Sequence, residues 1–76
     1  MSTYPTRDLY LSAYLHALGY TLVDIQRDAD RRCTFTFEDR ETRPGDTLAY
    51  YDRTATVNAA AFVDAIRLLK VRLHSA

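Results

Sequence analysis

The chain has 76 residues, 47% of them hydrophobic and only two each Gly and Pro, so it is too short for two cores and too apolar to remain unfolded. Ten Lys and Arg residues balance ten Asp and Glu residues, and this zero net charge provides no long-range attraction for polyanions or anionic membranes. The single cysteine, Cys33, excludes an internal disulfide, and no segment reaches the roughly 20 apolar residues of a transmembrane helix. We therefore expect residues 1–76 to form one small domain in the cytoplasm, with no membrane contact.

The first helix is predicted over residues 6–18, where apolar side chains cover most of the helical circumference. Thr6 is suited to the N-cap position, Asp8 puts a negative charge in the first turn, and Gly19 is a typical C-terminal cap. We expect residues 1–5, ahead of this helix, to be frayed. A helix this apolar has to be covered on more than one side.

Two strands are predicted next, over residues 20–26 and 32–38. The second strand alternates strictly and places Cys33, Phe35 and Phe37 on one face. The short polar segment between the two strands consists of turn-forming residues, which favours an antiparallel hairpin.

The segment after the hairpin has no regular pattern. Residues 39–46 are expected to form a loop, because Pro44 disfavours the helical conformation in the residue before it. Residues 47–53 then suit a short helix, and residues 54–57 are β-branched, as in a short strand.

The C-terminal helix is predicted over residues 58–73, with Asn58 as its N-cap. The apolar positions that share one face at helical spacing are Phe62, Ile66, Leu69 and Leu73. The sequence therefore predicts an α+β domain in the order helix, β-hairpin, irregular segment and C-terminal helix, with both helices packed on a small antiparallel sheet. Because a two-stranded sheet is marginal alone, either residues 54–57 add a strand or a second chain does.

Three segments carry a resemblance to a known family: DLYLSAYLHALG at residues 8–19, FTFED at residues 35–39, and VNAAAF followed by RLLKVRL within residues 57–73. On these segments the chain resembles a family of short bacterial and phage proteins catalogued as domain of unknown function 5659. The resemblance implies this α+β fold and an accessory or regulatory role, and it implies no activity. In that family a regular helical stretch precedes the VNA segment, whereas here RPGD interrupts it.

The groups of residues that could suggest a catalytic site have the wrong spacing or too little surrounding chain. Asp8, Ser12 and His16 share one helical stripe, but Asp8 lies two turns, about 12 Å, from His16, so the three cannot form a triad. Carboxylates near the hairpin, Asp24, Glu38 and Asp39, have the composition of a nuclease metal site, but the chain is too short for such a core. Two histidines and one cysteine give no zinc spacing, and two glycines give no phosphate loop. We therefore expect no catalytic residue, metal or cofactor and rank a hydrolase or nuclease last.

Exposed aromatic and apolar residues on the helices suggest a protein-binding surface. Tyrosine is a frequent interface anchor, and the apolar surface exceeds what so small a monomer needs to bury. The residues predicted to contact a partner are Tyr10, Tyr14, Tyr51, Leu68 and Val71. The first hypothesis is therefore a non-enzymatic interaction module, homodimeric or docked on another protein.

A basic stripe supports an alternative, a nucleic-acid-binding accessory protein. Arg67, Lys70 and His74 follow one side of the last helix, and arginines crowd the hairpin turn, which could extend the stripe if the turn lies near the helix end. The full set predicted for this role is Arg27, Arg31, Arg32, Arg67, Lys70, Arg72 and His74. Zero net charge weighs against this alternative.

Overall fold

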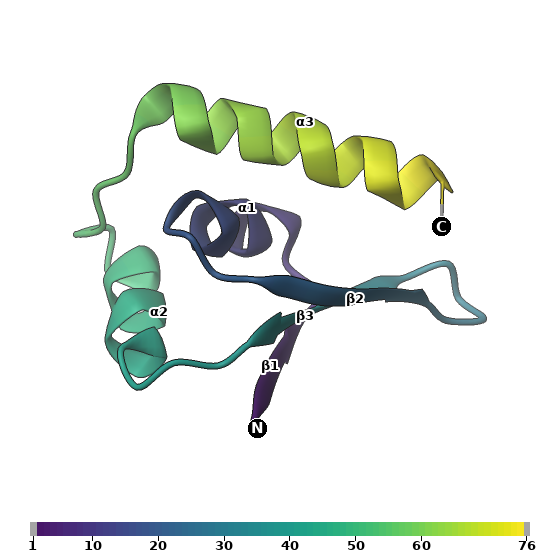
Figure 1. The fold of residues 1–76 in the computed structure, drawn as a ribbon, viewed down its shortest axis with the longest axis horizontal. Coiled ribbons are helices and arrows are strands. Elements are labelled where there is room, and N and C mark those ends of the chain that lie inside the picture. Colours follow the sequence, from purple (N-terminus) through teal and green to yellow (C-terminus); the bar gives the residue numbers. More distant parts are fainter. Residues whose placement is uncertain (1, 76) are drawn as a thin grey trace.

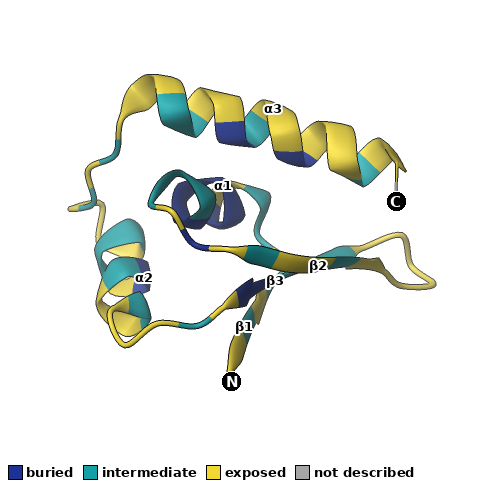
Figure 2. Ribbon diagram, in the orientation of Figure 1, coloured by how far each residue is buried: buried dark blue, intermediate teal, exposed yellow. Residues whose placement is uncertain are grey.

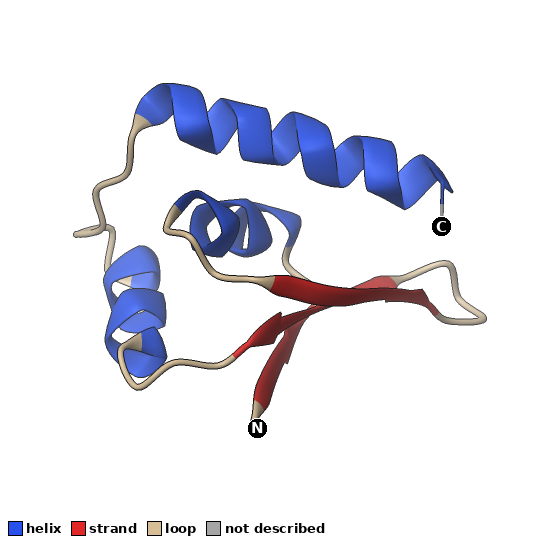
Figure 3. Ribbon diagram, viewed as in Figure 1, coloured by secondary structure: helices blue, strands red, loops and turns tan. Residues whose placement is uncertain are grey.

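Three strands and three helices follow one another along residues 2–75 of the computed structural model (Figures 1 and 3). In chain order they are β1 (Thr3–Thr6), α1 (Leu9–Ala17), β2 (Leu22–Arg27), β3 (Cys33–Glu38), α2 (Arg43–Tyr51) and α3 (Ala59–Ser75). The α+β class and the predicted hairpin are thus confirmed. None of the helices described within residues 2–75 is long and apolar enough to cross a lipid bilayer.

The sheet has the order β1-β3-β2, with β3 antiparallel to both of its neighbours. Phe37 in the central strand faces Tyr4 on one side and Leu22 on the other. An irregularity between Leu22 and Asp24 bends β2 at the sheet's edge. Because both outer strands are antiparallel to β3, they run parallel to each other, and α1 connects them across the sheet.

The third strand corrects the prediction for the N-terminus. Residues 3–6 are paired along β3, with Thr3 opposite Glu38 and Thr6 opposite Phe35, and so residues 3–5 are not frayed. Met1 lies outside the described residues. Pro5 is tolerated because β1 is an edge strand. No further strand lies outside it, so the missing N–H of proline removes no hydrogen bond on that side. Residues 54–57 form no strand, and β1 supplies the third strand of the sheet instead.

The first helix begins later than predicted, at Leu9. Asp8, and not Thr6, is its N-cap: Asp8 Oδ1 accepts hydrogen bonds from the Tyr10 and Leu11 amides at 3.0 and 3.1 Å. Thr6 is unavailable as a cap because it belongs to β1. At the other end Gly19 has φ +96°, the left-handed conformation that glycine adopts without strain. The Gly19 and Tyr20 amides bond back to the helix in a Schellman arrangement, which confirms the predicted stop.

The middle segment is also more helical than predicted. Helix α2 starts at Arg43 and includes the RPGD stretch, so residues 43–46 are not a loop. Pro44 suits the first helical turn, where its absent N–H would have no helical partner. Asn58 caps α3 as predicted, its Oδ1 accepting from the Ala61 amide at 2.9 Å.

The core lies between the sheet and helices α1 and α3, which cover the same side of the sheet (Figures 1 and 2). The buried hydrophobic residues are Leu11, Ala13, Tyr14, Leu15, Tyr20, Phe35, Phe37, Ala65 and Leu69. Helix α1 is the most deeply buried helix, as its apolar circumference predicted, whereas α3 is buried along one stripe. The other side of the sheet carries polar side chains, which alternate with the core positions along β3.

Candidate interaction surfaces

Stacked tyrosines join α1 to α2. The rings of Tyr14 and Tyr50 pack with centroids 5.5 Å apart, and those of Tyr50 and Tyr51 meet edge to face at 5.2 Å. Burial raises the pKa of Tyr50, and the nearby Asp8, Tyr51 and Tyr10 raise it further. Burial also raises the pKa of Tyr51, with Asp8 and Tyr4 adding to the effect. Tyrosine rings of α1 and α2 therefore pack on one another where the two helices meet.

The outer part of this cluster is exposed to solvent. Tyr10 is 51% exposed, Leu48 61% and Tyr51 62%, although all three are large and apolar. Spacing along α2 puts Pro44, Leu48 and Tyr51 on one face beside the side that packs on the domain. We call Tyr4, Tyr10, Pro44, Leu48 and Tyr51 the tyrosine surface.

The structure separates the residues predicted to contact a partner. Tyr10 and Tyr51 belong to the tyrosine surface, but Tyr14 is only 5% exposed and cannot reach a partner, because α2 covers its ring. Leu68 on α3 is 40% exposed and lies beside the C-terminal end of α1, away from Tyr10. There it lines a shallow depression together with His16, Ala17, Ala61, Asp64 and Ala65. Val71 is 63% exposed on α3 and does not line this depression.

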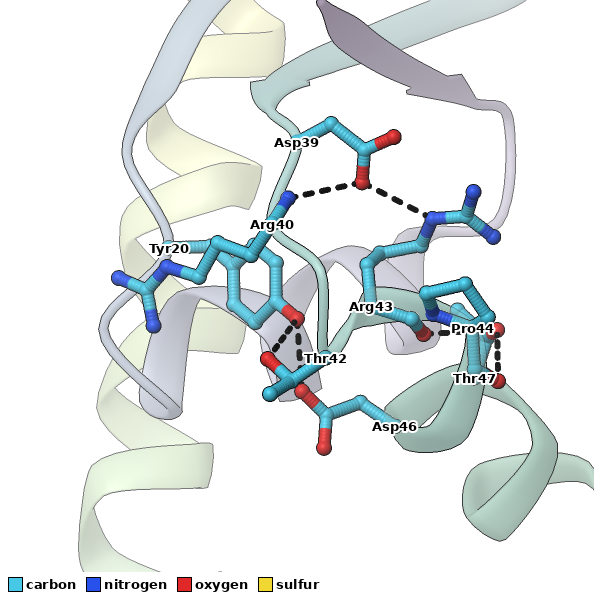
Figure 4. Close-up of polar contacts among 8 residues, drawn as sticks. All are labelled: Tyr20, Asp39, Arg40, Thr42, Arg43, Pro44, Asp46 and Thr47. Carbon is cyan, nitrogen blue, oxygen red and sulfur yellow. Dashed lines mark hydrogen bonds and ion pairs between the residues drawn. The ribbon is translucent and has the colours of Figure 1, made fainter.

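A polar network joins the start of α2 to the rest of the domain (Figure 4). The Tyr20 hydroxyl donates to Asp46 Oδ2 at 2.6 Å and lies 3.5 Å from the Thr42 hydroxyl. Burial, followed by the hydrogen bond to Asp46, raises the pKa of Tyr20. The guanidinium of Arg40 stacks on the Tyr20 ring at 4.3 Å and donates to the Gly19 carbonyl.

A second part of the network anchors the start of α2. Arg43 Nε donates to Asp39 Oδ1 at 3.0 Å, and this hydrogen bond lowers the pKa of the Asp39 carboxyl. The Arg43 guanidinium lies 4.2 Å from the centre of the Tyr4 ring, a cation–π contact. Sequence reasoning missed Arg43, Asp46 and Leu48 as contributors. The i, i+4 spacing of Asp39 and Arg43 is a signal for this ion pair, but it indicates a pair only in a helix, and the sequence predicts a loop for this segment.

The residues considered for catalysis have structural roles. Ser12 is fully buried and donates its hydroxyl to the Asp8 carbonyl at 2.7 Å, while the Asp8 carboxylate caps α1. His16 lies on the separate depression described above. Across residues 2–75, no three His, Cys, Asp or Glu side chains gather as a metal site would require. Cys33 is a free thiol, partly buried at the edge of the core.

The basic residues of the hairpin and of α3 do meet. The Arg27 guanidinium donates to the Leu73 carbonyl in the last turns of α3, so the hairpin turn lies beside the helix end (Figure 1). All seven residues predicted for nucleic-acid contact are exposed. Arg72 faces a different side of α3 from Arg67, because it follows Arg67 by five positions, a rotation of about 140° around the helix axis. We call the other six, Arg27, Arg31, Arg32, Arg67, Lys70 and His74, the basic end.

These features define a small α+β domain with a three-stranded antiparallel sheet, two helices on one side of it, and two exposed surfaces of different chemistry. The chain matches a protein family over residues 1–75, and it belongs to that family, described as domain of unknown function (DUF5659). The resemblance noted in the sequence is thereby confirmed. No curated protein and no solved structure matches the chain. RPGD begins helix α2 and does not interrupt a helical stretch.

Proposed function

We propose that this protein is a small non-enzymatic accessory or regulatory module that binds another protein chain through the tyrosine surface. The observation that carries the proposal is the exposure of Tyr10, Leu48 and Tyr51, of which Leu48 and Tyr51 share one face of α2 and Tyr51 has a packed aromatic support. Three large apolar side chains more than half exposed are costly in a domain this small unless they are covered in a complex.

The support explains why the surface is suited to binding. The ring of Tyr51 rests on Tyr50, which in turn packs on the buried Tyr14. An anchor already held in place loses little conformational entropy when it is covered, so more of its contact energy contributes to affinity. Tyrosine and arginine are the residue types enriched in interface hot spots, and Arg43 lies beside the surface.

Catalysis lacks support from the same geometry. In the serine, histidine and aspartate set that the sequence offered, Asp8 and Ser12 are engaged in capping and packing α1, while His16 lines the depression beside Leu68. The depression at His16 is shallow and is lined mainly by alanine and leucine. A binding role needs none of these groups, since a surface alone is sufficient.

The test compares two variants matched in exposure. Leu48→Ser/Tyr51→Ser removes two anchors of the tyrosine surface, whereas Val71→Ser removes an equally exposed apolar side chain from α3. Light scattering after size exclusion measures self-association, and capture by tagged protein followed by binding of each purified candidate measures docking on other proteins. Loss of one hot-spot anchor costs about 2 kcal/mol or more, so we expect affinity for the partner or the second copy to fall roughly 30-fold or more in the double variant.

Two outcomes would overturn the proposal. A chain that stays monomeric and binds no purified candidate has no such function. Equal binding by the double variant and the wild type, with loss only in Val71→Ser, would move the interface to α3.

A further inference from the structure

The zero net charge conceals an uneven distribution of charge. Residues 27–32 and 67–74, which the Arg27–Leu73 hydrogen bond brings together, contain six of the ten Lys and Arg residues but only two of the ten Asp and Glu residues. The remainder of the chain is correspondingly acidic. Helix α2, which carries Pro44, Leu48 and Tyr51 of the tyrosine surface, lies at the opposite end of the molecule from the hairpin turn and the end of α3 (Figure 1). Zero net charge of the whole chain therefore does not weigh against polyanion binding at this end.

The hairpin turn is preorganised by its own aspartate. Asp28 Oδ1 accepts from the Asp30 and Arg32 amides at 2.9 and 3.0 Å, and the Asp28 amide bonds to the Arg32 carbonyl at 2.9 Å. Arg31 takes a left-handed conformation with φ 65° to complete the turn. The Asp28 carboxylate is thus occupied within the turn, and its second oxygen is paired with Arg7 at 3.6 Å.

The cations of the basic end have no such partners. The ion pairs among residues 2–75 are Arg7 with Asp28 and Arg43 with Asp39, and neither uses a residue of the basic end. Arg27 alone has a fixed role, since its guanidinium bonds the Leu73 carbonyl and thereby positions the turn. Arg31, Arg32, Arg67 and Lys70 remain exposed and available to an external anion.

The spacing of these charges fits a polyanion better than a single phosphate. Along α3, Arg67, Lys70 and His74 share one side of the helix over about 10 Å, and the hairpin arginines lie beyond the helix end. A nucleic-acid strand presents a phosphate about every 3.4 Å along the helix axis of a duplex, so a stripe of this length spans about three. Arginine also offers the planar donor geometry that phosphate accepts in pairs.

The aromatic residues indicate which form of nucleic acid fits. Residues 27–32 and 67–74 contain no Phe, Tyr or Trp, so the basic end lacks the large aromatic side chains on which single-stranded bases stack best. We propose that the basic end binds the phosphate backbone of double-stranded nucleic acid without reading its sequence. This site is separate from the tyrosine surface, so the protein could hold a protein partner at one end and a duplex at the other.

The chain provides a matched pair of variants for the test. Arg31 and Arg53 are the same residue type with almost the same left-handed backbone, φ 65° and 62°, but only Arg31 lies at the basic end. Asparagine tolerates this conformation, so Arg31→Asn and Arg53→Asn each remove one positive charge with equal disturbance of the backbone. Lys70→Gln, on the exposed side of α3, adds a second position without a backbone change.

The measurement is fluorescence anisotropy with 24-base-pair DNA and RNA duplexes of arbitrary sequence, between 50 and 200 mM salt. With about four phosphates contacted, log K falls against log salt with a slope near −3.6, a loss of about 150-fold over this range. Arg31→Asn should weaken binding roughly tenfold at 50 mM salt and reduce the slope by about 0.9, while Arg53→Asn matches the wild type. Arg31→Asn combined with Lys70→Gln should reduce the slope by about 1.8.

The controls distinguish other polyanions. Single-stranded oligonucleotides should bind more weakly than duplexes, and vesicles containing 30% anionic lipid should bind no more tightly than the duplexes. The proposal is overturned by the absence of duplex binding at 50 mM salt, by equal effects of Arg31→Asn and Arg53→Asn, or by binding to the vesicles alone. None of these outcomes affects the tyrosine surface, because its variants leave the basic end intact.

Discussion

The hydrogen bond between Tyr20 and Asp46 is expected to hold α2 on the rest of the domain, and Tyr20→Phe removes it with little change in packing. Tyr20 is 3% exposed, and its hydroxyl donates to a carboxylate at 2.6 Å, which makes the bond charge-assisted. Hydrogen bonds to charged groups contribute about 1.5–3 kcal/mol, and because Asp46 is only half-buried we expect the lower value, about 1.5 kcal/mol. For a domain of this size that loss lowers Tm by about 6–12 °C.

The assay is a double-mutant cycle that combines Tyr20→Phe with Asp46→Ala. The stability of each variant is measured by urea unfolding, and local opening is measured by hydrogen exchange of the α2 amides. Asp46 also lies in the first turn of α2, where its charge favours the helix dipole, and the cycle cancels that separate contribution. We expect a coupling free energy of about 1.5 kcal/mol and faster exchange in α2 than in α1. Additive losses in the two single variants, with unchanged exchange in α2, would refute the role assigned to this bond.

Three further predictions concern the core, the helix cap and alkaline stability. Phe37→Ala, at a fully buried position in the central strand, should lower the free energy of unfolding by about 3–5 kcal/mol. The control Val23→Ala, on the exposed side of β2, should lower it by less than about 0.5 kcal/mol. Comparable losses for the two variants in urea titrations would contradict the core assignment. Asp8→Ala should lower the free energy of unfolding by about 1 kcal/mol, and Asp8→Ser by much less, because serine keeps a side-chain oxygen for the helix cap. Equal losses of stability in the two variants, measured by thermal unfolding, would contradict the capping role of Asp8. Burial raises the pKa of Tyr14 and Tyr20, so the folded chain retains their protons more tightly than the unfolded chain does. The contribution of these two tyrosines to stability should therefore be constant up to about pH 10 and be lost above it, more gently in Tyr20→Phe, as followed by circular dichroism; stability that rises above pH 10 would reverse the sign of this linkage.

The elements that sequence analysis predicted well are those whose signals are local. The alternation of Cys33, Phe35 and Phe37 identified the central strand and its buried face, and both phenylalanines are indeed buried. Gly19 and Asn58 marked helix ends correctly, because a left-handed glycine and a capping amide act within a few residues of their own position. The residues of the basic end were also predicted, since Arg67, Lys70 and His74 follow one side of a helix and the hairpin arginines are close in sequence.

What only the tertiary structure decided depends on contacts between distant segments. Residues 3–6 have no strand signal of their own that outweighs fraying, and they are ordered by pairing with β3, more than 25 residues away. The start of α2 at Arg43, against the local effect of Pro44, depends on the ion pair with Asp39 and the stacking on Tyr4.

The exposure of individual side chains was decided in the same way. Tyr10 and Tyr14 are one turn apart on the same helix, and which of them faces solvent depends on where α2 packs. The sequence by itself therefore determined the first and last helices, the hairpin with its buried face, and the basic residues of the hairpin and of α3, because these depend on residue type and period. The tertiary structure alone decided the third strand, the accessible tyrosines and the meeting of the hairpin with α3, since burial and proximity are properties of the packed chain.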